Sequence, residues 1–158
     1  MMEWEPSIRF VLLGSRELEA YAILLVRVAL GVFFAISGAN KLFVAQRTQS
    51  MYETLVAAKV PVPRLMTYFV SSVEFLGGCL LTVGLLSSLA CLALLVNMLV
   101  AILTTTLSSI AKGQSPLNWL DSFLYLPEVL YVLFFVWLIC SGPGRFSVDF
   151  WFASRLQQ

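Results

Sequence analysis

The stretch from Arg27 to Phe43 decides the fold, and it reads R-V-A-L-G-V-F-F-A-I-S-G-A-N-K-L-F. It is an apolar run with a cation near each end, and it forms the main part of a first membrane-spanning helix. Because an α-helix turns by about 100° per residue, positions separated by alternating steps of four and three share one stripe. That stripe holds the two cations and two glycines. Its members are Arg27, Gly31, Phe34, Gly38 and Lys41.

The composition identifies an integral membrane protein. Of the 158 residues, 59% are hydrophobic and only 12% are charged, whereas a soluble domain carries about 25% charged residues. In a lipid bilayer the stripe turns inward, because small residues let a neighbouring helix approach closely and charges avoid hydrocarbon. The net charge of +1 and the lack of a basic run give no reason to expect nucleic acid as a partner.

Three more apolar runs follow the first, and each has about the 20 residues that a hydrocarbon core of roughly 30 Å requires. The link from Leu85 to Ser88 is short and uncharged, so the second and third runs should form an antiparallel hairpin. We therefore predict an all-α membrane protein with four transmembrane helices in an antiparallel bundle and both termini on the same side. The expected spans cover about residues 20–44, 65–86, 88–110 and 123–141.

The other segments divide the chain around these spans. We expect residues 1–19 to form a peripheral segment, 20–149 the transmembrane domain and 150–158 a C-terminal tail. Within the domain, residues 45–64 should contain a short interfacial helix, and residues 111–122 should form a polar loop. Outside the spans, each side of the membrane receives four Lys and Arg residues, so charge does not decide the orientation. We favour a bacterial-type cell membrane with cytoplasmic termini.

Four ionisable side chains lie within the predicted spans, where a charge costs roughly 2.5–3.5 kcal/mol on insertion scales. Two are cations, Arg27 and Lys41, and two are acids, Glu74 and Glu128, so internal pairing is favoured. Counting depth at about 1.5 Å per residue, we expect Lys41 to pair with Glu128 near the loop side. Arg27 could reach inward to Glu74 or outward to the tail, and Asn97 lies at a depth similar to that of Glu74.

This buried polar set has two interpretations. Paired charges can simply fix the order and register of the helices, since removing one partner leaves an unpaired buried charge. Alternatively, they can line a polar cavity that holds a quinone head group, a proton path or a small polar ligand. Spacing alone does not distinguish the two. In the tail, Arg145 and Asp149 are four residues apart and could tie that segment to Arg27.

The residue types limit the redox chemistry that this chain can support by itself. It has no histidine, which excludes histidine-ligated haem, iron and copper sites within it, and we predict no metal site. Its three cysteines lie in apolar runs without a C-x-x-C pair, so apolar packing is their expected role. In a redox complex, electrons would therefore be carried by a partner, and no cofactor would be attached covalently or through a metal.

Several motifs occur here in one order and spacing: the quoted stretch at 27–43, E-F-L-G-G at 74–78, Asn97-Met98, Glu128, and S-G-P-G-R-F-S-V-D at 141–149. Together they resemble the DoxX-like membrane proteins, from about residue 22 to residue 149. The resemblance implies a four-helix membrane bundle whose motif positions coincide with the buried polar set. Those positions are Arg27, Gly38, Lys41, Glu74, Gly78, Glu128, Arg145, Ser147 and Asp149.

The resemblance also implies a functional setting. Relatives include DoxD, the membrane subunit of a thiosulfate:quinone oxidoreductase, and proteins tied to membrane oxidoreductase complexes. We therefore expect an accessory subunit of a quinone-linked oxidoreductase complex, which is not an enzyme on its own and which contacts lipid and other membrane subunits. The alternatives are a purely structural anchor or assembly subunit without a ligand, and a small transporter or lipid-binding protein. Residues 1–19 lie outside the resemblance.

Overall fold

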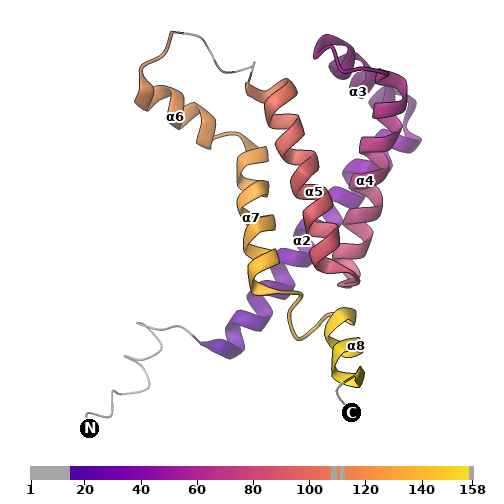
Figure 1. The fold of residues 1–158 in the computed structure, drawn as a ribbon, viewed down its shortest axis with the longest axis vertical. Helices are drawn as coiled ribbons and strands as arrows, with labels where there is room; N and C mark the ends of the chain where they lie inside the picture. The colour runs from indigo at the N-terminus through magenta and orange to yellow at the C-terminus, as the bar shows by residue number, and fades with distance from the viewer. Residues whose placement is uncertain (1–14, 108–109, 111–112, 157–158) are drawn as a thin grey trace.

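The computed structural model describes residues 15–107, 110 and 113–156, and the elements in this part of the chain are all helical (Figure 1). The prediction of an all-α protein is therefore confirmed for these residues. The predicted peripheral segment 1–19 lies mostly outside them. The helices are α2 Arg16–Phe43, α3 Ala45–Ala57, α4 Pro63–Val83, α5 Ser87–Ala101, the π-helical η1 Ile102–Thr106, α6 Pro116–Leu124, α7 Pro127–Ser141 and α8 Val148–Leu156.

Three helical segments are long and apolar enough to cross a membrane. They are Leu18–Phe43, Pro63–Val83 and Ser87–Thr106, with 26, 21 and 20 residues. The fourth apolar run is different, because α6 and α7 are bent by 65° and form a candidate span only if the pair is taken together. The structure thus has three candidate spans, or four with the bent pair.

The segment predicted as a polar loop at 111–122 contains most of helix α6, so this prediction is wrong for residues 116–122. The local sequence explains the helix. Ser115 accepts a hydrogen bond from the amide of Asn118 at 3.4 Å, and Pro116 occupies the first turn, where a proline is tolerated. By contrast, the short helix predicted within 45–64 is present as α3.

Helices α2 and α4 form the closest pair, and glycines make that approach possible. A Cβ atom on Gly38 would lie 2.8 Å from the carbonyl oxygen of Ser71, and one on Gly78 would lie 2.7 Å from that of Gly31. The order of contacts reverses along the two helices, because Gly31 meets Gly78 and Gly38 meets Ser71. They therefore run antiparallel, with a register set by backbone contact.

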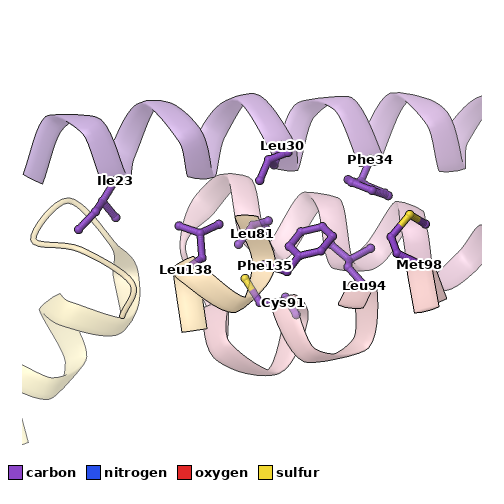
Figure 2. Packing of buried hydrophobic residues seen from close by; sticks show 10 residues of the cluster. Ile23, Leu30, Phe34, Leu81, Cys91, Leu94, Met98, Phe135 and Leu138 are labelled. Carbon is purple, nitrogen blue, oxygen red and sulfur yellow. The ribbon is translucent and has the colours of Figure 1, made fainter. Parts of the chain in front are cut away.

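The apolar core lies where α2 meets α4, α5 and α7. Figure 2 shows Leu30 and Phe34 pointing from α2 towards Leu81, Leu94 and Phe135 on the other helices. Leu81, Leu94 and Phe135 are fully buried. Since lipid is as apolar as these side chains, dense packing rather than removal from water supplies the stabilisation here.

Different short helices and turns lie at the two ends of the long helices. In Figure 1, α3 and α6 lie at one end, whereas the turn between α4 and α5 lies at the other end together with α8 and the start of α2. We call these the loop end and the tail end. Arg27, Ser87 and Ser147 are buried near the tail end, whereas Thr67, Ser71 and Glu74 are buried along α4.

Candidate functional site

Between α2, α4 and α5, the carboxylate of Glu74 is the centre of a buried polar cluster. Lys41 donates to both of its oxygens, at 2.8 Å to Oε1 and 2.6 Å to Oε2. Ser37 Oγ donates to Oε2 and Asn97 Nδ2 to Oε1, each at 3.3 Å. The side chain of Glu74 is 4% exposed and that of Lys41 is 27% exposed. The carboxylate is therefore buried and fully bonded, while the ammonium group remains partly accessible.

These residues line a cavity of about 310 Å³ that is bounded by α2, α3, α4, α5, η1 and α7. Its volume is at the lower end of the range of about 300–1,000 Å³ for small-molecule sites. Phe33, Phe34 and Tyr131 form an aromatic wall, with ring centroids 5.2–5.3 Å apart. The π-helical η1 contributes Thr104 and Thr105 to the lining, and such segments occur frequently at functional sites. We call this space the inner cavity.

Glu128 also lines the inner cavity but takes no part in the cluster. Its Oε2 atom is buried and accepts no hydrogen bond within the described part of the chain. A buried carboxylate oxygen without a donor is unfavourable, so this atom has an unused capacity to accept a hydrogen bond. The inner cavity thus contains one satisfied carboxylate and one unsatisfied carboxylate oxygen.

The predicted ion pair between Lys41 and Glu128 is wrong, because Lys41 pairs with Glu74. The expected pairing came from estimating the depth of each residue along its own helix, and that estimate did not identify Glu74 as the partner of Lys41. The contact of Gly38 with Ser71 and Phe75 places Lys41, one turn further along α2, beside Glu74. The register that the glycines impose therefore selects the partner.

Arg27 does not belong to this centre, so the single shared centre that the sequence suggested is divided in two. Its side chain is 2% exposed and lies at the tail end. Nη1 donates to the carbonyl oxygens of Leu81 at 2.8 Å and Thr82 at 3.1 Å, and Nη2 donates to that of Phe146 at 2.8 Å. Among the described residues no carboxylate forms an ion pair with it. Arg27 therefore binds the end of α4 and the segment before α8 through backbone carbonyls.

Asp149 makes the tail contact by capping helix α5. Its two carboxylate oxygens accept hydrogen bonds from the amides of Leu86 and Ser87, both at 2.7 Å, and its own amide donates to the carbonyl of Gly84 at 2.9 Å. Gly84 has a φ of +78°, and a Cβ atom there would clash with Arg27 and Ser147. Only glycine combines this backbone conformation with the absence of a side chain. The second tail residue, Arg145, is exposed.

The charge of Asp149 is favoured in this position. Burial alone would raise its pKa, but the hydrogen bonds from Ser87 and Leu86 and the nearby charge of Arg27 together lower the pKa below its usual value of 3.8. The carboxylate therefore stays ionised at neutral pH and faces the positive end of the α5 dipole.

Replacing Asp149 with Asn should lower stability by about 1–2 kcal/mol at neutral pH, because the cap of α5 weakens. A group whose pKa is lowered on folding stabilises the folded state above its unfolded pKa and loses that effect as the pH falls through the folded pKa. The difference between wild type and Asp149→Asn, measured by unfolding in detergent, should thus be constant near neutral pH and shrink below about pH 4. A difference that stays the same at low pH would contradict this explanation.

One participant, Ser37, was not singled out from the sequence, and a second, Ser147, was named only as a motif position of the resemblance. Ser37 lies four residues before Lys41 on α2, and this helical spacing was a signal that could have found it. Ser147 is buried, donates to the carbonyl of Gly144 at 2.7 Å and accepts from the amide of Phe150 at 3.0 Å. Its contribution is to shape the turn before α8.

The fold and the site define a class: a helical membrane protein with a lysine–glutamate pair beside a cavity between its helices. The family model described as DoxX matches residues 22–107, more than half of the chain, and the chain belongs to this family. The match includes Arg27, Lys41, Glu74 and Asn97 but ends before Glu128 and the tail. No curated protein and no solved structure matches the chain.

Proposed function

We propose that this DoxX-family protein binds a quinone head group in the inner cavity and serves as an accessory membrane subunit of an oxidoreductase complex. The observation that carries the proposal is the lining of the inner cavity, which combines hydrogen-bonding groups with the aromatic wall. A quinone head group has matching parts, because it carries polar oxygens at the edges of a flat ring. When bound, it supplies a group that accepts electrons and protons.

The donors around Glu74 fit the oxygens of such a ring. An ammonium group has three N–H donors, and Lys41 uses two of its contacts on Glu74. Asn97 has a second N–H beyond the one that it donates to Glu74. Lys41 and Asn97 can therefore hold a carbonyl oxygen while their geometry stays fixed by the carboxylate. The charges of Lys41 and Glu74 compensate each other, so this pair adds no net charge beside a neutral head group.

Glu128 offers the complementary group. Its unsatisfied Oε2 atom can accept a hydrogen bond from a hydroxyl group, which the reduced form of a quinone carries and the oxidised form does not. Phe34 and Tyr131, whose rings meet at 5.2 Å and 74°, provide apolar surface for the ring of the ligand.

We further propose that α6 and α7 together form the fourth span, so that the antiparallel bundle is complete and both ends of the protein lie on the cytoplasmic side of a cell membrane. The 65° bend is supported by Pro127 in the first turn of α7. It places Glu128, directly after the bend, at the inner cavity.

Filling the inner cavity should abolish quinone binding without removing a charge. Ala101 lines the cavity at the end of α5, so Ala101→Trp should weaken binding of a short-chain ubiquinone analogue at least about tenfold by occupying its space. Binding is measured by titrating the purified protein in nanodiscs with the oxidised and the reduced analogue. The matched control is Ala93→Trp, since Ala93 is exposed on the same helix.

Unchanged affinity in Ala101→Trp, or equal loss in Ala93→Trp, would refute binding in the inner cavity. The subunit role needs a separate measurement, which is gentle purification of the native protein followed by identification of co-purifying chains. Association with a redox partner is the expected result. A partner without quinone-linked activity, together with no analogue binding, would favour the structural anchor instead.

A further inference from the structure

A second hollow lies on the outside of α2, next to the inner cavity. It has a volume of about 280 Å³, and all but one of its lining residues belong to α2. We call it the outer groove. Its lining consists of Phe33, Ile36, Ser37, Asn40, Lys41 and Arg47.

We infer that the outer groove binds an anionic phospholipid, with the phosphate at Arg47 and Asn40 and an acyl chain along Phe33 and Ile36. This inference goes beyond the quinone proposal and does not depend on it. It is carried by the charge of the groove, by its division into a polar and an apolar part, and by its depth in the bilayer.

The charge of the groove comes from Arg47. Two cations line the groove, but Lys41 is neutralised by Glu74. Arg47 is exposed, and the described residues provide no ion-pair partner for it. The groove therefore carries a net positive charge, which favours an anionic head group over a zwitterionic one. A guanidinium group is well suited to phosphate, because it offers paired donors in one plane.

The polar and apolar parts of the groove are aligned with the bilayer. The candidate span on α2 ends at Phe43, with Asn40 three residues before that end and Arg47 four residues after it, on the next helix α3. In the inferred arrangement this end of α2 lies near the head groups. Phe33 lies ten residues before Phe43, roughly 15 Å deeper at 1.5 Å per residue. Phe33 and Ile36 are 47% and 57% exposed, so they present apolar surface to the hydrocarbon. This order matches a phospholipid held upright beside α2.

The inference is tested by replacing Arg47 with Gln, which changes an exposed side chain and should leave the fold intact. The delipidated full-length protein is placed in phosphatidylcholine nanodiscs, and retention of added phosphatidylglycerol is measured by native mass spectrometry. Loss of one interfacial cation should lower the preference for phosphatidylglycerol over phosphatidylcholine about fivefold. The matched controls are Lys59→Gln and Arg64→Gln, which remove exposed cations at the same end of the molecule and should keep the preference.

Two further measurements separate this lipid from other occupants. Ile36→Trp should lower retention of both lipids by filling the apolar part, whereas Leu25→Trp on the 71% exposed position of α2 should not. Inorganic phosphate is added as a competitor and should have no effect. An unchanged preference in Arg47→Gln, an equal loss in the Lys59 control, or displacement by inorganic phosphate would overturn the inference.

Discussion

Lys41→Met should lower the free energy of unfolding by about 3–5 kcal/mol, because it leaves the carboxylate of Glu74 buried without its counter-ion. The side chain of Glu74 is only 4% exposed, and the remaining donors, Ser37 and Asn97, lie at 3.3 Å. Glu74→Leu should cost less. The long side chain of Lys41 is 27% exposed and lies two residues before the end of α2, so it can extend to the interface.

The double variant Lys41→Met/Glu74→Leu provides the decisive comparison. It removes both charges, so its stability should return to within about 1–2 kcal/mol of wild type, as buried pairs replaced by apolar residues often do. All variants are compared by unfolding with SDS in mixed micelles. If the double variant is as unstable as Lys41→Met, the buried charge is not the cause of the loss. Recovered stability with lost analogue binding would show that the pair serves the ligand rather than the fold.

Gly38→Leu should prevent α2 and α4 from packing and lower stability by at least about 3 kcal/mol, because overpacking at a backbone contact cannot be relieved by a rotamer change. Even the Cβ atom of an alanine would lie 2.7 Å from Cα of Phe75 and 2.8 Å from the carbonyl oxygen of Ser71. The larger side chain should also separate Lys41 from Glu74, one turn away. Loss of the ion pair is therefore an expected secondary effect.

Ala29→Leu is the matched control for this variant, since Ala29 is exposed on the same helix and faces away from α4. It adds the same kind of apolar side chain to α2 and should leave the unfolding midpoint nearly unchanged. Unfolding in SDS and cross-linking between cysteines introduced on α2 and α4 measure the two effects. A stable Gly38→Leu protein with normal cross-linking would show that α2 and α4 need not approach at this glycine.

Much of the fold follows from residues that are close together in the chain. The apolar runs are about as long as a bilayer is thick. The short link from Leu85 to Ser88 forces the two runs that it joins to form an antiparallel hairpin. The stripe of glycines and cations on α2 also identified the face that packs against α4. These are properties of single helices, and spacing along one helix determines them.

The bend between α6 and α7 was harder to predict. A proline in an apolar run is compatible both with a straight helix that begins there and with two helices that meet there. The fourth span was expected to start at about residue 123, and the helix that begins at Pro116 was not predicted. Helix α7 packs on α5, whereas α6 points away from α5 (Figure 1). This tertiary arrangement shows that two helices meet at the proline.

By itself, the sequence determined that this is a helical membrane protein with a few ionisable side chains inside its apolar helices, and it grouped Arg27 with Lys41, Glu74, Asn97 and Glu128 in one centre. Tertiary structure decided the partners: Lys41 with Glu74, Arg27 with backbone carbonyls, and Asp149 with the amides of α5. The physical reason is that pairing depends on the relative register of different helices. That register is set by backbone contacts at glycines. Estimating the depth of each residue along its own helix is not precise enough to predict it.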